Sequence, residues 1–248
     1  MHTFGVTLLS GGLDSTTVTA HAKTCTDHLT AVTFRYGQTH SREVACAVDI
    51  ARLLGVEHRL VDISFLSAVS WYSALTNPEA FPVPTNRPGE EIGSGIPITY
   101  VPLRNTIFIG LSAALLESKV LHSIEAEGFA RDEVRAVLYM APNAIDYSGY
   151  PDCRPAFYDQ MRRTLRYGSK LGAQYGVDIE IETPIINMSK AEIAEMGLRL
   201  NAPLDRTWSC YLAGEKPCDS CDACVLRARG FDEAGIADPL LVRLAGGL

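Results

Sequence analysis

The segment Leu8-Leu9-Ser10-Gly11-Gly12-Leu13-Asp14-Ser15-Thr16-Thr17 lies between two stretches of different hydrophobic pattern. An apolar run precedes it, and residues 16–23 after it have helical character. This order predicts a strand, a glycine-rich turn and a helix. The two glycines let backbone N–H groups approach a ligand closely, and the helix begins with unpaired N–H groups at its positive end. The segment therefore predicts an anion-binding loop suited to phosphate.

Side chains of this loop add to the predicted cradle. Ser10 and Ser15 offer hydroxyl donors, and Asp14 offers a carboxylate that can hold a metal ion or orient the ligand. The lysine of a Walker loop is missing here, and a plain tight turn is the alternative interpretation. The residues expected to contact the nucleotide are Leu8, Leu9, Ser10, Gly11, Gly12, Leu13, Asp14, Ser15, Thr16, Thr17 and Val18.

The order Ser-Gly-Gly-Leu-Asp-Ser at residues 10–15 resembles the pyrophosphate loop of the N-type ATP pyrophosphatases. Those enzymes cleave ATP between the α and β phosphates and activate a substrate as its adenylate. The resemblance implies that the loop holds the β and γ phosphates of ATP. It also implies that Mg²⁺ neutralises them, with Asp14 as a candidate ligand.

Composition limits the classes of function. The 248 residues are 47% hydrophobic, which suits one α/β domain with an appendage or two small domains. A formal net charge of −7 without a Lys/Arg-rich block argues against broad nucleic-acid binding. No apolar run approaches the roughly 20 residues of a membrane span, and the N-terminus lacks the pattern of a signal peptide. We expect a cytoplasmic protein with no nucleic-acid and no membrane partner.

Strand and helix patterns alternate along the chain. Beyond the strand before the glycine loop, we expect strands at 29–34, 58–63, 135–140 and 177–183, with helices between them. Ser41 is expected to cap a helix that ends near Leu54, and Ser189 with Glu192 forms a capping-box pattern. The pattern predicts an α/β fold with an open parallel five-stranded sheet and helices on both faces. The glycine loop and residues 35–40 and 143–155 then share the carboxyl edge of the sheet.

The stretch 77–102 is rich in proline and glycine and is expected to be a long loop. A lid, an oligomer contact and a plain insertion are the open interpretations.

Four of the seven cysteines, Cys210, Cys218, Cys221 and Cys224, fall within fifteen residues of chain. Two-residue spacers let neighbouring thiolates meet one ion, and four sulfurs match a closed, structural zinc site. An iron–sulfur cluster and thiol chemistry are the alternatives. We therefore expect a nucleotide-binding domain at 1–204 and a zinc-binding segment at 205–248. Cys25 and Cys46 are expected to be small core residues.

Three blocks of the sequence match one family: residues 10–15, Asn143 to Pro155, and Thr207 to Tyr211 followed by the other cysteines. They resemble the QueC family, whose members make 7-cyano-7-deazaguanine, and the resemblance runs nearly end to end. Shorter blocks that also resemble the family lie at 36–40, 100–105 and 189–193, in the same order along the chain as in the family. The resemblance implies a sheet like that of the adenine nucleotide alpha-hydrolases and a homodimer. The implied reaction uses ATP to activate 7-carboxy-7-deazaguanine, ammonia to form the amide, and a second ATP to form the nitrile.

The resemblance also implies roles for individual residues. The candidates for catalysis are Asp14, Arg104, Lys190 and His40. The candidates for substrate binding are Tyr36, Gln38, Asn105, Asp146, Tyr147, Asp152, Arg154 and Trp208. A surface or helix-end charge is the alternative for the cations, core packing for the aromatic residues, and a structural role for His40.

Some features depart from the family's pattern. Arg35 and Thr39 stand where the family usually has Asp and Arg, and Ala141 where Gly is common. The segment 118–135 is longer than usual, and we interpret it as a surface near the substrate edge that a partner could use. These departures keep an alternative open, in which the activated acyl group passes to another amine, such as a protein N-terminus. A tRNA-modifying thiolase and a zinc-knuckle interaction module are more distant alternatives.

Overall fold

The structure is a computed structural model that describes residues 1–38, 42–88, 92, 95–144, 149–212 and 214–246. Its centre is a parallel sheet with the strand order β3-β2-β1-β4-β5. The strands are β1 (His2–Leu8), β2 (His28–Arg35), β3 (Glu57–Asp62), β4 (Val134–Tyr139) and β5 (Ile179–Glu182). Every neighbouring pair is parallel, which confirms the predicted five-stranded sheet. The winding reverses between β1 and β4, the place where such sheets bind ligands.

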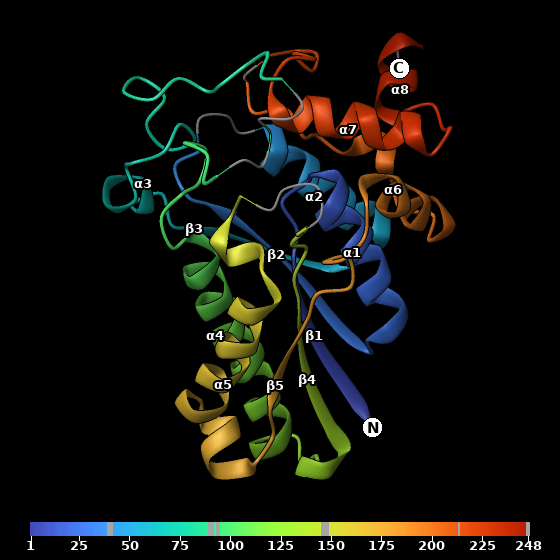
Figure 1. Cartoon of the computed structure of the whole chain (residues 1–248). Helices are drawn as coiled ribbons and strands as arrows, with labels where there is room; N and C mark the ends of the chain where they lie inside the picture. Colours follow the sequence, from blue (N-terminus) through green and yellow to red (C-terminus); the bar gives the residue numbers. More distant parts are fainter. Residues whose placement is uncertain (39–41, 89–91, 93–94, 145–148, 213, 247–248) are drawn as a thin grey trace.

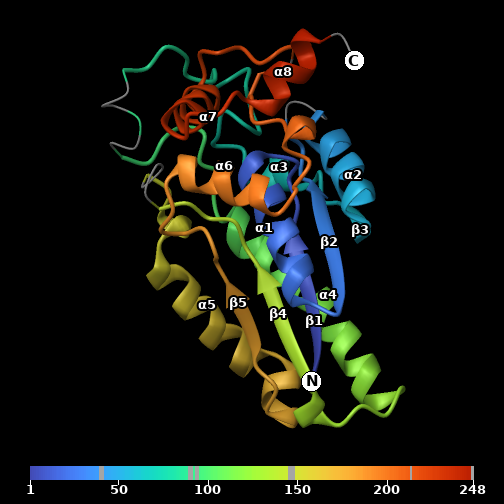
Figure 2. The same ribbon diagram turned by 90° about the vertical axis from the view of Figure 1, so that its right-hand side faces the viewer.

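Helices cover both faces of the sheet, as predicted (Figure 1). One face packs against α1 (Leu13–Cys25), α2 (Arg42–Leu54) and α6 (Lys190–Arg199). The other face packs against α4 (Arg104–Glu125) and α5 (Pro155–Gly168). Figure 2 shows the two layers from the side. The apolar side chains of the strands are buried between them, in two clusters on the two faces of the sheet.

Helix α4 is the one helix in the described part of the chain that is long and apolar enough to cross a membrane. Its buried residues, among them Ile109, Leu116 and Val120, pack against β1 and β4. This burial marks α4 as a core helix of the α/β domain.

Two predictions need correction here. The single helix that we expect between the strands at 135–140 and 177–183, over about 156–175, is two elements, because α5 ends at Gly168 and a π-helical turn spans Leu171–Tyr175. The backbone folds so tightly there that a Cβ on Gly172 would lie 2.0 Å from the carbonyl oxygen of Arg166. Cys25 is exposed at the end of α1, so its prediction as a core residue was wrong. Cys46 is half-buried.

The segment 118–135 lies at the wrong edge for the role we predicted. It includes the end of α4 and leads through a short 3₁₀ turn (Arg131–Glu133) into the start of β4. Phe129 packs against His2, the first residue of β1, with ring centroids 4.6 Å apart. The extension therefore sits at the amino ends of the strands, opposite the glycine loop, and cannot shape the substrate edge.

The carboxyl end of the sheet is covered by α7 (Asp222–Glu233) and α8 (Pro239–Ala245) (Figure 1). Part of the predicted long loop packs against this segment. Arg87 forms an ion pair with the buried Asp222, and the amide of Asn86 donates to the carbonyl of Ser220 at 2.8 Å. A one-turn helix, α3 (Leu66–Val69), and 3₁₀ turns at Pro151–Cys153 and Leu204–Arg206 complete the described elements.

Candidate active site

A cavity of about 340 Å³ opens at the carboxyl ends of β1, β2 and β4. It lies at the reversal of the sheet, where the fold predicts a ligand. The predicted site residues that line it are Leu8, Leu9, Ser10, Gly12, Leu13, Asp14, Ser15, Tyr36, Gln38, Arg104, Asn105, Lys190 and Trp208. One space thus joins the glycine loop to residues from four other parts of the chain.

The glycine loop has the tight geometry that its sequence predicts. Gly11 has φ +91°, and a Cβ at this position would lie 2.3 Å from the carbonyl oxygen of Glu43 in α2. The two serines are joined by hydrogen bonds: the hydroxyls of Ser10 and Ser15 are 2.9 Å apart, and the amide of Ser10 donates to Ser15 Oγ at 3.1 Å. Gly11 thus lets α2 lie directly against the loop and presents the N-terminus of α1 to the cavity.

The last three predicted nucleotide contacts lie behind the loop. Thr16, Thr17 and Val18 are fully buried, and none lines the cavity. Thr16 donates its hydroxyl to the carbonyl of Gly12 at 2.8 Å, so it supports the start of α1. These positions belong to the packing of α1, since the helix begins at Leu13 and turns them inward.

Asp14 and Lys190 form an ion pair at the rim of the loop, with Nζ and Oδ2 2.5 Å apart. Lys190 is the first residue of α6, and the predicted capping box of Ser189 and Glu192 is confirmed. A Cβ on Gly230 would lie 2.4 Å from the Cβ of Lys190, so α7 packs directly on the lysine. The pair places an ammonium and a carboxylate beside the loop, and these groups suit a phosphate and a cation respectively.

Arg104 and Tyr36 form the next part of the wall. Arg104 begins α4 directly after Leu103, which has φ +55°. Its guanidinium carbon lies 5.8 Å from the centre of the Tyr36 ring, and its Nε has no hydrogen-bond partner among the described residues. Burial raises the pKa of Tyr36, and the charge of Arg104 opposes that shift. A buried cation with an open donor suits a carboxylate or phosphate.

The far end of the cavity is lined by Cys153 of the turn Pro151–Cys153 and by Tyr158 of α5. Asp152, a predicted substrate residue, lies in the same turn behind this lining and does not itself line the cavity. Asp152 and Tyr158 are 6% and 1% exposed, and Asp152 Oδ1 and Tyr158 Oη have no hydrogen-bond partner in the described part of the chain. Burial raises the pKa of Asp152, while Arg104 lowers it. Such unpaired buried atoms are costly unless a ligand pairs with them.

A second predicted substrate residue, Arg154, lies outside the lining of the cavity. It is the N-cap residue of α5, its side chain makes no capping hydrogen bond, and that side chain is exposed. Three further predicted residues lie outside the described residues: His40, Asp146 and Tyr147. The same holds for Thr39, one of the positions that depart from the family's pattern. Arg35 is half-exposed and pairs with Asp62 at 3.5 Å.

Glu43 is a cavity residue that was not among the residues predicted for the site. It is the second residue of α2, and its carboxyl group faces Arg104. Burial raises its pKa to about 8, although Arg104 lowers it. The signal that could have found it is its place three residues after His40, on a helix that begins at the binding edge.

Trp208 connects the cavity to the cysteine segment. Its backbone N–H donates to the carbonyl of Gly11 at 2.8 Å, and the guanidinium of Arg42 lies 4.0 Å from its ring centre. The buried Arg227 of α7 donates to Thr207 Oγ1 at 2.8 Å and to Ser209 Oγ at 3.2 Å, and it pairs with Asp238. The C-terminal segment therefore holds the glycine loop in place.

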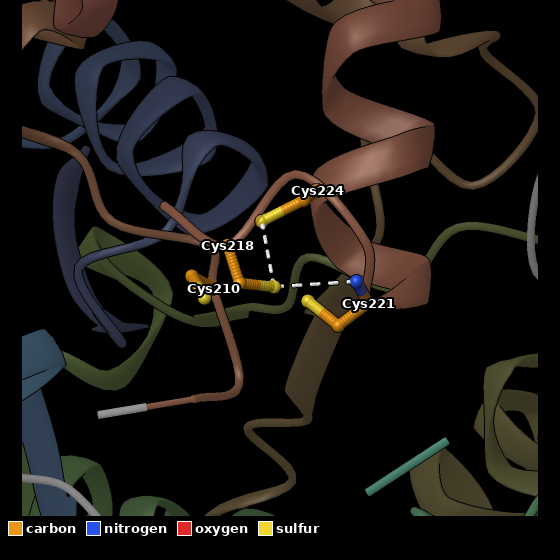
Figure 3. A group of neighbouring side chains, drawn as sticks. All are labelled: Cys210, Cys218, Cys221 and Cys224. Atoms are coloured by element: carbon orange, nitrogen blue, oxygen red, sulfur yellow. Dashed lines mark hydrogen bonds between the residues drawn. The ribbon is translucent and has the colours of Figure 1, made fainter. Parts of the chain in front are cut away.

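Figure 3 shows the side chains of Cys210, Cys218, Cys221 and Cys224 turned toward one centre. Their sulfur atoms all lie within 4.8 Å of one another, and those of Cys218 and Cys224 are 3.9 Å apart. A tetrahedral ion with Zn–S distances of about 2.3 Å requires sulfurs roughly 3.8 Å apart. The cluster thus fits zinc, and a set of four sulfurs leaves no open position for catalysis.

Comparison with known proteins decides the family. The family model described as queuosine biosynthesis protein QueC matches residues 5–235. The chain belongs to the QueC family. Among QueC-family relatives, 7-cyano-7-deazaguanine synthase of Thermoplasma acidophilum is 43% identical over 95% of this chain and 90% of its own length. The enzyme of the same name from Trichodesmium erythraeum is 43% identical over 95% of this chain and 99% of its own. NMN synthetase of Francisella tularensis is similar at 18% identity and a TM-score of 0.37, over 98% of this chain and 77% of that one.

Proposed function

We propose that this chain is an ATP-dependent ligase that converts 7-carboxy-7-deazaguanine and ammonia to 7-cyano-7-deazaguanine, as its relatives' name implies. The observation that carries the proposal is one cavity with two unlike ends. The Asp14–Lys190 pair and the glycine loop form an anion-binding end. Tyr158, next to the turn that carries the buried Asp152, forms a polar end.

The chemistry explains why both ends are needed. A carboxylate does not react with ammonia, because hydroxide is a very poor leaving group. Transfer of AMP to the carboxylate gives an acyl-adenylate whose leaving group departs easily, and a second adenylation of the amide oxygen permits loss of AMP to the nitrile. The protein must therefore hold ATP and substrate side by side and stabilise the pyrophosphate that leaves.

Residues of the anion-binding end take the phosphate role in this proposal. The loop at residues 10–15 and the N-terminus of α1 receive the β and γ phosphates, and Lys190 neutralises charge on them. Asp14 would hold Mg²⁺ once Lys190 turns to the phosphates, and that ion would supply charge neutralisation. Arg104 lines the same cavity, and its charge acts on both Glu43 and Asp152. In this proposal it orients the substrate carboxylate against the α phosphate, because a guanidinium can bind two oxygens at once.

The polar end takes the deazaguanine. The deazaguanine ring has N–H groups that can donate hydrogen bonds to Asp152 Oδ1, and it has a carbonyl that can accept one from Tyr158 Oη. Tyr36 offers a flat face beside Arg104. Asn105 and Gln38 line the cavity and are further candidates, and Asp146, Tyr147, Arg154 and His40 remain proposals from the family resemblance.

We assign the four cysteines to structural zinc, which would fix the segment that holds Trp208 against Gly11. A cytoplasmic location and a homodimer are further parts of the proposal that rest on the family resemblance. The dimer is supported by exposed apolar side chains at Phe65, Val69, Trp71 and Tyr72. Transfer of the acyl group to another amine has lost one of its supports, because the segment 118–135 lies at the opposite edge of the sheet.

The test is release of pyrophosphate and AMP from ATP with and without 7-carboxy-7-deazaguanine. We expect release to depend on this carboxylate and Asp14→Ala to lower it by about 100-fold or more. The control Asp49→Ala removes a half-exposed carboxylate from α2 and should keep the wild-type rate. Release that does not depend on 7-carboxy-7-deazaguanine, or full activity of Asp14→Ala, would count against the proposed chemistry.

A further inference from the structure

Glu43 is placed by the same packing that shapes the glycine loop. Its backbone carbonyl lies against Gly11, so closely that only glycine fits there. Its side chain lines the cavity that contains the loop, Lys190 and Arg104. A carboxyl group is thus fixed beside the phosphate end of the site, on a helix rather than on a loop.

The surroundings of Glu43 differ from those of an ordinary carboxylate. The charged groups that share its cavity are Asp14 of α1, Arg104 of α4, Lys190 of α6 and Arg227 of α7. The other titratable groups that line it are Tyr36, Tyr150, Cys153, Tyr158 and Tyr211. Arg42 and Cys46 lie near it on its own helix. Lys190 is paired with Asp14, and Arg227 with Asp238, which leaves Arg104 as the cation that acts on Glu43. Arg104 stabilises the ionised form, while burial opposes it and raises the pKa to about 8.

The proposed reaction requires a group that removes a proton near the acyl carbon. Ammonia that attacks an acyl-adenylate becomes a positively charged nitrogen in the adduct. If that proton stays, the nitrogen is expelled again in preference to AMP. A base held in the cavity prevents this reversal.

We propose that Glu43 is the general base of the amide-forming step, a catalytic role that rests on the proposed function. The ammonia nitrogen forms a bond to the acyl carbon, and the Glu43 carboxylate takes one proton from that nitrogen. The bond between the acyl carbon and the AMP oxygen then breaks, and its electron pair leaves with AMP. Amide, AMP and a neutral Glu43 result, and Glu43 returns its proton to solvent before the next turnover.

A pKa close to 8 suits this role, because a base works best when its pKa is near the operating pH. The rate of amide formation per free ammonia should therefore rise as the pH increases through about 8. This rise reports ionisation of Glu43, since free ammonia is calculated at each pH and does not enter the dependence.

The experiment compares wild type, Glu43→Gln and the control Asp49→Asn, which neutralises a half-exposed carboxylate on the same helix. Adenylation is measured as exchange of pyrophosphate into ATP in the presence of 7-carboxy-7-deazaguanine, and amide formation by mass spectrometry across pH 6–9.5. We expect Glu43→Gln to keep near-wild-type exchange, to lose about 100-fold or more of amide formation, and to lose the rise near pH 8. The control should keep all three properties.

Hydroxylamine separates catalysis from structure. Its adduct is a stronger acid than that of ammonia and loses its proton to water, so Glu43→Gln should form the hydroxamate at close to the wild-type rate. An amide yield or a pH profile like that of wild type overturns the proposal. Equal loss of exchange and of amide formation, or no recovery with hydroxylamine, also overturns it in favour of a binding role. If wild type itself makes no adenylate, the proposed function fails rather than the role of Glu43.

Discussion

Substitution Gly11→Ala tests how tightly the glycine loop is packed. A side chain at φ +91° is strained by about 1–2 kcal/mol, as a left-handed conformation is for any L-residue. In addition, the new methyl group would lie 2.3 Å from the carbonyl oxygen of Glu43, so α2 must move. Such overpacking typically costs about 1–3 kcal/mol, which gives roughly 2–5 kcal/mol in total. At about 2–4 °C per kcal/mol for a chain of this size, the melting temperature should fall by roughly 4–20 °C.

The assay is thermal unfolding followed by circular dichroism, together with the KM for ATP. The matched control is Gly55→Ala, which has φ +63° but no atom within 4 Å of the added Cβ. This variant has the backbone strain but not the steric overlap, so its free energy of unfolding should fall by only about 1–2 kcal/mol. Its KM for ATP should not change. Equal melting temperatures for the two variants, or an unchanged KM in Gly11→Ala, would refute the reasoning.

Further predictions concern the metal, the buried carboxyls and their pH dependence. Elemental analysis should find one zinc per chain, and Cys218→Ser should lose it and unfold at lower temperature; bound iron, or a variant as stable as wild type, would contradict the site. Burial raises the pKa of Glu43 from 4.5 to about 8, so the folded state binds its proton more tightly than the unfolded state. This contribution is complete below about pH 4.5 and is lost by about pH 8, an upper limit of about 5 kcal/mol at about 1.4 kcal/mol per pH unit. Glu43→Gln should therefore gain stability relative to wild type between pH 5 and 9 in denaturant titrations, and a constant difference would refute the shift. Asp152→Asn should raise the KM for 7-carboxy-7-deazaguanine by about 10-fold or more and leave that for ATP unchanged, and the opposite pattern would place the substrate elsewhere.

The alternation of apolar residues was enough to predict the sheet, because strand and helix periods differ and the chain follows them closely. The capping box at Ser189 and the glycine loop were also predictable, since each depends on residues close in sequence. The break after Gly168 was not, because the close approach of Gly172 to the backbone of Arg166 leaves no signal in the hydrophobic pattern.

Predictions that depended on position in the fold were less successful. The segment 118–135 connects a helix to a parallel strand, and such connections lie at the amino edge of the sheet. Topology could have corrected that prediction before any coordinates. Glu43 and Tyr158 were missed for a different reason, because an acidic residue at a helix start and an apolar-spaced tyrosine both have ordinary structural explanations. Only the packing of α2 and α5 around one cavity singles them out.

The most direct test of the account is mass spectrometry of the purified protein incubated with ATP, Mg²⁺, ammonia and 7-carboxy-7-deazaguanine. The account predicts the amide as an intermediate and 7-cyano-7-deazaguanine as the end product, with AMP formed in both steps. Neither compound above a blank without enzyme, or the acyl group found on a protein amine instead, would contradict it.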